Sequence, residues 1–92
     1  MVYKVIIYEN KTEKQFASLK NKFSDDVWKR MLDFLSTTPS QGKKEMGFRK
    51  YNLPDANRII YDILEGNIVR ILCAGDHNVY ERFLNKHVKK KK

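Results

Sequence analysis

Apolar side chains near the start of the chain change from the spacing of a strand to that of a helix. Residues 2–8 are rich in Val, Ile and Tyr, which predicts a strand that is buried at least in part on both faces. Phe16, Leu19 and Phe23 then recur at i, i+3 and i+7, which is one stripe of an amphipathic helix. The chain is therefore expected to begin with a strand followed by a helix.

Two pairs of polar residues lie just before this helical stripe, and each pair has the spacing of a capping box. In a capping box, the side chain at the helix start and the side chain three residues later each satisfy a backbone N–H group of the other residue. Asn10 with Glu13, or Thr12 with Gln15, offers this arrangement. Both pairs predict a helix start near residue 10.

A second helix is predicted directly after the first. Ser24 is a favourable N-cap, and Asp25 and Asp26 place acids in the first turn. Apolar side chains follow in a wide helical stripe that should face a sheet: Val27, Trp28, Met31, Leu32, Phe34 and Leu35. Pro39 disfavours a helical residue before it, so this helix should end within "STTP".

The middle of the chain changes from helical spacing to short β-rich runs. Residues 40–47, "SQGKKEMG", are expected to form a polar, basic loop. Residues 48–53 then predict a short strand and residues 54–57, "PDAN", a turn. Two further strands are predicted at 58–64 and 68–73.

The loop at residues 65–67 sets the register of these last two strands if it contains three residues. Asp62 then faces Arg70, and such an opposite-charge pair is worth at least a few tenths of a kcal/mol. In the same register Arg58 faces Ala74. Arg70 is therefore expected to be a partner of Asp62, with a contact to RNA as the alternative.

The last segment, "NVYERFLNKHV", returns to helical spacing with Val79 and Phe83 on one side. Together the elements predict an α+β domain of order β-α-α-β-β-β, with a helical hairpin packed on one face of a small, mostly antiparallel sheet. A short C-terminal helix or strand completes it. Residues 1–88 should form one domain and residues 89–92 a flexible basic tail. The second face of the sheet is expected to be open and basic.

Charge adds the strongest compositional signal. The 92 residues carry nineteen Lys and Arg against eleven Asp and Glu, a net charge of +8. Between residues 43 and 58 five basic residues accompany two acids, and residues 82–92 hold six basic residues and no acid. A domain this basic binds nucleic acid or pairs with an acidic partner, and plain solubility is the alternative. The tail either adds affinity for phosphates or only aids solubility.

Other features exclude several classes of protein. The single cysteine, Cys73, excludes a disulfide framework and a Cys-rich zinc site, and its place in an apolar run predicts a small core residue. No apolar run approaches the ~18 residues of a membrane span. The first residues lack the basic region and cleavage site of a signal peptide. We therefore expect a cytoplasmic protein that does not enter a membrane.

The chemistry-bearing residues form a metal-free set. The motifs of nucleotide-binding loops, dinucleotide folds, zinc proteases and serine hydrolases are absent. His77 and His87 have no nearby cluster of acids and cysteines, so neither a metal nor a small-molecule cofactor is expected. A set of Arg, Lys, His and Tyr suits cleavage of RNA by its own 2′-OH, since cations stabilise the phosphate charge and an imidazole protonates the leaving oxygen. His77 and Tyr80 also have the simpler interpretation of surface and packing residues.

The stretch "NRIIYDILEGNIVRILCAGDHNVYERF", after a strand, a helical hairpin and a basic loop, resembles the RelE/ParE superfamily of type II toxins. The resemblance covers the whole chain in element order and about the last forty residues in sequence. It implies an mRNA interferase, often acting in the ribosomal A site, that is neutralised by an antitoxin encoded beside it. The expected partners are therefore a cognate antitoxin, mRNA and the ribosome.

The resemblance also assigns roles to single residues. Arg58 matches the arginine that contacts phosphate, Tyr80 the tyrosine that stacks on or orients the substrate, and His77 the general acid. Arg49 and Lys50 match basic strand positions that stabilise charge or activate the 2′-OH.

The strand that usually carries two catalytic lysines reads "FRKY" here, so the general base stays open between Lys50 and Glu45. Further cations are expected to contact RNA: Lys43, Lys44, Arg70 and Arg82. Two other functions also stay open, a ParE-like inhibitor of DNA gyrase without nuclease activity and a non-catalytic basic nucleic-acid-binding domain.

Overall fold

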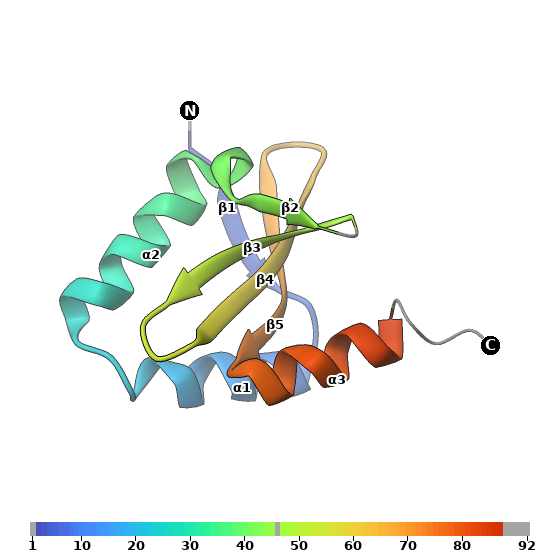
Figure 1. The fold of residues 1–92 in the computed structure, drawn as a ribbon. Helices are drawn as coiled ribbons and strands as arrows, with labels where there is room; N and C mark the ends of the chain where they lie inside the picture. Colours follow the sequence, from blue (N-terminus) through green and yellow to red (C-terminus); the bar gives the residue numbers. More distant parts are fainter. Residues whose placement is uncertain (1, 46, 88–92) are drawn as a thin grey trace.

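The computed structural model describes residues 2–45 and 47–87, and of Glu45 and His87 it describes the backbone alone. Within these residues the chain forms one mixed sheet with helices on both faces (Figure 1). The elements in chain order are β1 (Lys4–Ile7), α1 (Asn10–Lys20), α2 (Asp25–Thr37), the 3-10 helix η1 (Pro39–Gln41), β2 (Lys43–Glu45), β3 (Phe48–Leu53), β4 (Asn57–Leu64), β5 (Ile68–Gly75) and α3 (His77–His87). The expected α+β class is confirmed.

The strands lie side by side in the order β1-β5-β4-β3-β2. β1 pairs with β5 in parallel, and the other neighbours are antiparallel. The predicted turn at "PDAN" connects β3 to β4, and the three-residue loop connects β4 to β5. In the described part of the chain, every helix is too short or too polar to cross a lipid bilayer.

Helices α1 and α2 form the expected hairpin and cover one face of the sheet. The Ser24 side chain accepts a hydrogen bond from the backbone N–H of Val27 at 3.3 Å, so Ser24 is the N-cap of α2, as predicted. Phe16 of α1 and Trp28 of α2 join the helices through rings whose centroids are 4.8 Å apart. The main core lies beneath them and is built from buried side chains of both helices and of β3, β4 and β5: Leu19, Trp28, Met31, Leu35, Leu53, Ile59, Tyr61, Val69, Ile71 and Ala74.

The segment expected as a basic loop, residues 40–47, instead contributes a strand. β2 pairs with β3, so that Lys43 lies opposite Lys50 and Lys44 opposite Arg49. Three polar residues give no hydrophobic alternation, and the edge of β3 supplies the backbone partners that make this short strand possible. The prediction of a loop here was wrong.

The register of β4 and β5 agrees with the prediction at one end of the pair and departs from it at the other. Asp62 lies opposite Arg70, as expected, but Arg58 lies opposite Gly75 rather than Ala74. The cause is a β-bulge, because Leu72 is an extra residue on β5 and shifts all later pairs by one. Sequence alternation alone cannot show such an insertion.

Side chains of helix α1 supply hydrogen-bond partners for the backbone groups at this bulge. The Thr12 hydroxyl donates to the Leu72 carbonyl oxygen at 3.2 Å, and the Gln15 side-chain oxygen accepts from the Ala74 N–H at 3.3 Å. The predicted capping boxes were therefore wrong, since α1 begins after Glu9 without a side-chain cap. The two residues thought to cap the helix hold the bulge of β5 instead.

The second face of the sheet is not open, because α3 packs on it. In Figure 1, α3 lies in front of β5 and α1 lies behind it. A second cluster joins the helix to the strands through buried side chains of β4, β5 and α3: Ile60, Cys73, Tyr80 and Leu84. The C-terminal segment is thus a helix, and it covers part of the face that was expected to be exposed.

Candidate functional site

Tyr80 lies at the centre of the residues that the sequence singles out. The Arg58 guanidinium carbon is 4.7 Å from the centroid of the Tyr80 ring, and the Lys50 ammonium nitrogen is 5.5 Å from it. Both distances are within the range of a cation–π interaction. The two cations are therefore within about 10 Å of one another, close enough to repel each other and to favour an anion placed between them. We refer to Lys50, Arg58 and Tyr80 as the Tyr80 cluster; His77 lies three residues before Tyr80 in α3.

The strands place Lys50 and Arg58 on the same face of the sheet. Lys50 pairs with Ile60, and Arg58 pairs with Asn52, so their side chains follow the alternation of β3 and β4 onto the face that α3 covers. The bulge of β5 then puts Arg58 opposite Gly75, the residue from which the chain leaves the sheet toward α3. The register thus places a cation beside the start of the helix.

The cluster "GDHN" fixes the position of α3. Asp76 caps the helix, because its side chain accepts a hydrogen bond from the Val79 N–H at 3.1 Å and its carbonyl oxygen accepts from the Tyr80 N–H at 3.0 Å. At Gly75, a Cβ atom would approach the Val79 Cβ to 2.8 Å. A side chain there would push α3 away from the end of β5, so glycine is needed for the close approach.

His77 occupies the first turn of α3, one turn before Tyr80. Its side chain is 59% exposed, and its Nε2 lies 3.6 Å from a carboxylate oxygen of Glu81 at i+4. This contact is an ion pair only when the imidazole is protonated. The histidine is therefore accessible to a ligand on the surface and has the Glu81 carboxylate beside it.

Tyr80 is more buried than expected. Only 8% of the residue is exposed, and the ring packs with the second cluster beneath α3. The hollow beside it has a volume of only about 10 Å³ and is lined by residues of β3, β4 and α3: Phe48, Arg49, Lys50, Ile60, Tyr80 and Leu84. This is roughly the space of one water molecule. A nucleobase cannot enter it, so Tyr80 supports the two cations rather than offering a free stacking surface.

Arg49 lies apart from this cluster. It alternates with Lys50 along β3 and therefore points to the opposite face, where its Nη1 donates to the carbonyl oxygens of Ser40 and Gly42 at 2.9 and 3.1 Å. These bonds hold the turn after η1. Arg49 was predicted to share the site with Lys50, and the structure does not bring the two together.

Tyr61 lies near Arg49 in the main core. Its hydroxyl donates to the Pro39 carbonyl oxygen at 2.6 Å. Burial raises the pKa of Tyr61 to about 12, although the positive charge of Arg49 acts in the opposite direction. The phenol is therefore neutral and structural at ordinary pH.

The other expected RNA contacts are spread over the molecule. Lys43 lies opposite Lys50 and so extends the basic face beside the Tyr80 cluster, whereas Lys44 follows Arg49 to the other face. Arg70 binds Asp62 through two hydrogen bonds of 3.1 and 2.6 Å, and this bonding raises the pKa of the arginine.

The guanidinium of Arg70 also lies 5.3 Å from the centroid of the Tyr8 ring. It is thus a structural partner first, as the sequence predicted. The general-base alternatives are not decided, because the side chain of Glu45 lies outside the described part of the structure, as does the tail at 89–92.

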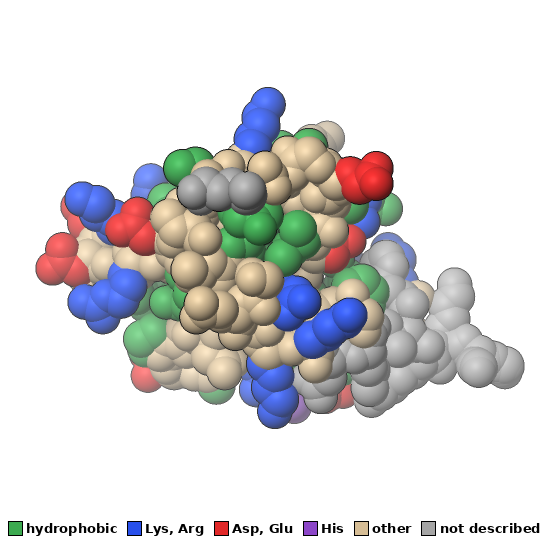
Figure 2. All heavy atoms as spheres, turned by 90° about the horizontal axis from the view of Figure 1, so that it is seen from above, with side chains coloured by type: hydrophobic (Ala, Val, Ile, Leu, Met, Phe, Trp, Pro, Cys, Tyr) green, Lys and Arg blue, Asp and Glu red, His purple; other side chains and the backbone are tan. Residues whose placement is uncertain are grey.

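The Tyr80 cluster contains two cations, Lys50 and Arg58, and Lys43 lies opposite Lys50 on the neighbouring strand. Figure 2 shows Lys and Arg side chains close together at the lower centre of the view, whereas the acidic side chains lie mostly toward its margins. Within the described residues, no carboxylate forms an ion pair with Arg58. A guanidinium that has no carboxylate partner is a ready binding group for phosphate.

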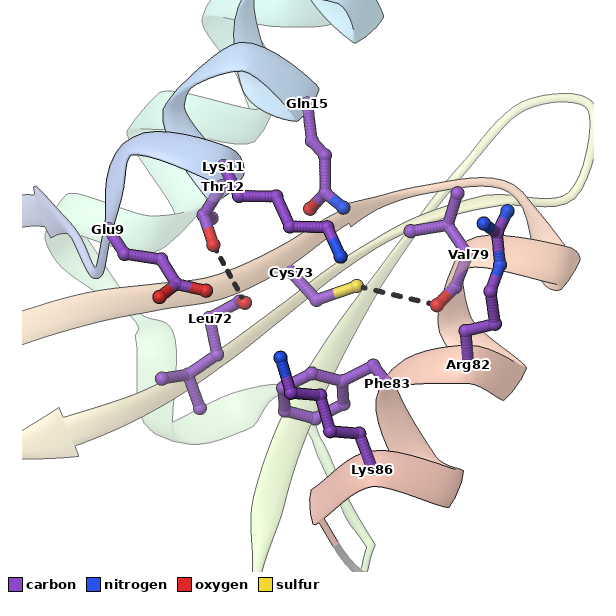
Figure 3. Close-up of a pocket in the computed structure, with 10 residues that line it drawn as sticks. All are labelled: Glu9, Lys11, Thr12, Gln15, Leu72, Cys73, Val79, Arg82, Phe83 and Lys86. Carbon is purple, nitrogen blue, oxygen red and sulfur yellow. Dashed lines mark hydrogen bonds between the residues drawn. The ribbon is translucent and has the colours of Figure 1, made fainter.

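Sequence reasoning missed a cavity on the other side of α3. It lies between α1 and α3 above β5 and has a volume of about 270 Å³ (Figure 3). Lys11 and Lys86 line it, and neither stood out in the sequence, because each looks like an ordinary exposed residue of an amphipathic helix. Their meeting depends on how the two helices pack on the sheet.

Cys73 lies at the floor of this cavity and behaves as the core residue that was expected. It is 3% exposed, and burial raises the pKa of its thiol to about 11, with the Lys11 charge acting in the opposite direction. The thiol is therefore protonated and poorly reactive near neutral pH.

No group of three or more His, Cys, Asp or Glu residues that could hold a metal ion occurs among the residues that the structure describes. Compared with known protein families and with characterised proteins, the chain matches none of them.

Proposed function

We propose that this protein is a metal-independent endoribonuclease of the RelE type, the toxin of a toxin–antitoxin pair that cleaves mRNA. The observation that carries the proposal is the contact of Lys50 and Arg58 with the Tyr80 ring, with His77 one turn away on α3. The sequence resemblance and the net charge of +8 point in the same direction.

The proposed reaction uses the RNA 2′-OH as the nucleophile. The 2′-oxygen attacks the adjacent phosphorus while its proton passes to a base, and the bond from phosphorus to the 5′-oxygen breaks. His77, in its protonated form, donates its proton to the departing 5′-oxygen. The products are a 2′,3′-cyclic phosphate and a 5′-hydroxyl.

Lys50 and Arg58 stabilise the negative charge that builds on the non-bridging phosphate oxygens. The two cations stabilise the transition state because they are held in place before the reaction. The Tyr80 ring holds both through cation–π contacts. Tyr80 therefore acts as a positioning residue in this proposal, because its burial keeps it from stacking on a base.

The proposed partners follow from charge and exposure. mRNA, alone or in the ribosomal A site, lies across the surface formed by Lys43, Lys50 and Arg58, since these residues share one face. A cognate antitoxin encoded nearby neutralises the protein with an acidic or amphipathic segment laid over this surface. Such an association is fast and sensitive to salt.

A second function is favoured by one observation. The lack of a base-sized hollow beside Tyr80 fits a protein that binds a nucleic acid or a gyrase subunit without cleaving anything. This alternative predicts that the wild-type protein never produces RNA fragments, whether the RNA is free or on ribosomes.

The test is a cleavage assay on free mRNA and on translating ribosomes. His77→Ala should slow cleavage by about 10²–10⁴-fold, the range for a lost general acid, and Arg58→Ala should slow it by about 10²–10³-fold. Lys29→Ala, an exposed lysine of α2, serves as the control and should leave the rate unchanged. Full activity in His77→Ala, or no cleavage by the wild type under either condition, would remove the proposal.

A further inference from the structure

The cavity between α1 and α3 is separate from the Tyr80 cluster although it shares a helix with it. Val79, Arg82, Phe83 and Lys86 line the cavity, whereas Tyr80 and Leu84 pack on the side toward β4. The cavity is the larger space of the two, about 270 Å³ against about 10 Å³. It is thus large enough for a base-sized group, which the hollow beside Tyr80 is not.

Three cations surround the cavity. Lys11 reaches into it from α1, and Arg82 and Lys86 approach from α3 (Figure 3). The positive charge of Lys11 lowers the pKa of Cys73 at the floor of the cavity, whereas burial raises it. Within the described residues, none of the three cations forms an ion pair with a carboxylate. Three cations gathered from two helices against a single lining carboxylate favour an anionic ligand.

The rest of the lining is suited to more than a bare anion. Leu72, Val79 and the Phe83 ring give an apolar wall against which a flat group can pack. Glu9 lies at the end of the cavity opposite Arg82, as Figure 3 shows. Its carboxylate accepts hydrogen bonds and repels phosphate, so it separates the polar hydrogen-bonding end of a ligand from the anionic end.

We propose that this cavity binds one nucleotide of single-stranded RNA, with its base against Phe83 and its phosphate between Lys11 and Lys86. Aromatic contact with the base combined with cations on the phosphate is the usual chemistry of sequence-tolerant single-strand binding. An acidic peptide would use the cations equally well but would place no flat ring on the apolar wall. The RNA assignment therefore uses more of the lining.

The inference rests on the proposed function for its choice of RNA, and it adds a second contact point on the substrate. A helix is about 10–12 Å across with its side chains, so a strand of a few nucleotides can reach both sides of α3. The cavity would hold the RNA while the Tyr80 cluster acts on a neighbouring phosphate. Binding at the cavity should accordingly affect affinity more than the rate of the chemical step.

The experiment measures binding of a short, fluorescently labelled 2′-O-methyl RNA, which lacks the nucleophile and cannot be cleaved. The test variant is Lys11→Glu with Lys86→Glu. The control variant, Lys20→Glu with Lys29→Glu, makes the same change in net charge at exposed lysines of α1 and α2 that do not line the cavity. The cavity variant should weaken binding about tenfold or more, since hydrogen bonds to charged groups are lost. The control should weaken it by less than about threefold, as expected for a change in the general field alone.

A second measurement keeps the test valid if a charge reversal disturbs folding. Lys11→Gln with Lys86→Gln removes the charges without adding acids, and thermal melting shows whether each variant is folded. In the wild type, amide NMR signals of α1 and α3 around the cavity should shift when the RNA is added.

Several outcomes would overturn the inference. Equal weakening by the cavity and control variants would show that only net charge matters. If Lys50→Ala and Arg58→Ala abolish RNA binding and the cavity variants do not, the proposed function is retained but the cavity is not an RNA site. Absence of RNA binding together with cavity-dependent binding of a glutamate-rich peptide would assign the cavity to a protein partner.

Discussion

At the scale of single residues, the role that the sequence predicts for Tyr80 differs from the role that the structure gives it. From the sequence it is a candidate for base stacking, whereas in the structure it is a buried ring that carries two cations. The cations depend on the ring, because cation–π contacts at a partly desolvated site are worth about 1–2 kcal/mol. In the proposed mechanism, Tyr80 therefore acts indirectly, through the two cations.

Removing the ring should lower both stability and activity. We predict that Tyr80→Ala reduces the free energy of unfolding by about 3–5 kcal/mol, the range for truncating a large core aromatic residue, as measured by denaturant titration. Tyr80→Phe keeps the ring and should retain most of the cleavage rate. A Tyr80→Ala protein as stable as the wild type would show that the ring does not pack as described.

Tyr61 and Cys73 determine how stability depends on alkaline pH. Both groups have a pKa that burial raises, to about 12 and about 11, so the folded protein keeps their protons when the unfolded chain has lost them. Their contribution to stability is therefore fully present below about pH 9. It is lost as the pH rises through the range from the ordinary values of 9.0 and 10.0 to the raised ones.

This pH effect can be measured with one variant. For Tyr61, a shift from 10.0 to about 12 corresponds to a loss of about 2–3 kcal/mol between these pH values. We expect Tyr61→Phe to be less stable than the wild type at neutral pH, because the hydrogen bond to Pro39 is lost. Its stability should fall less steeply above pH 10. Titration of all five tyrosines near pH 10 in the folded wild type would contradict this account.

At the scale of elements, the bulge of β5 connects α1 to the site. Leu72 shifts the register so that Arg58 lies opposite Gly75, and Thr12 satisfies the carbonyl oxygen of Leu72. Thr12 is 2% exposed, and its hydrogen bond to the Leu72 carbonyl oxygen is buried. A residue on a helix thus stabilises the strand geometry that positions a cation on the other face of the sheet.

The role of Thr12 predicts a specific pattern of stability. Thr12→Val keeps the shape but leaves the buried Leu72 carbonyl without its donor, which should cost about 1–3 kcal/mol. Thr12→Ser keeps the hydroxyl, loses one methyl group and should cost about 1 kcal/mol. Denaturant unfolding of both variants compares them directly. A Thr12→Val protein at least as stable as Thr12→Ser would show that the hydrogen bond does not matter.

The elements that could be predicted from the sequence are those that local signals determine. Ser24 marks the start of α2, the stripe around Met31 gives its buried face, and the Asp62–Arg70 pair sets one end of a hairpin. Each of these needs only spacing along one or two neighbouring segments.

The features that could not be predicted depend on contacts between distant segments. The bulge at Leu72 exists because Thr12, sixty positions earlier, supplies its donor. The strand β2 has no hydrophobic pattern and forms because β3 offers an edge. Lys50 could be placed in the site from the sequence, but only the pleat of β3 shows that its neighbour Arg49 points to the opposite face.

At the scale of the whole molecule, α3 separates two basic regions. One side of the helix meets Lys50 and Arg58, and the other closes a cavity with α1. Both regions are cationic, in keeping with a net charge of +8. A polyanion that approaches this side of the protein meets positive charge on either side of the helix, which favours rapid, salt-sensitive association.

The chemical nature of the RNA ends is the most direct test of the proposed function. Purified protein is incubated with RNA or translating ribosomes in the presence of EDTA, and the fragment ends are identified by mass spectrometry. Attack by the 2′-OH requires a 2′,3′-cyclic or 3′-phosphate on one fragment and a 5′-hydroxyl on the other, and EDTA should not change the rate. Fragments with a 5′-phosphate and a 3′-hydroxyl, or cleavage that stops when EDTA is added, would contradict the account.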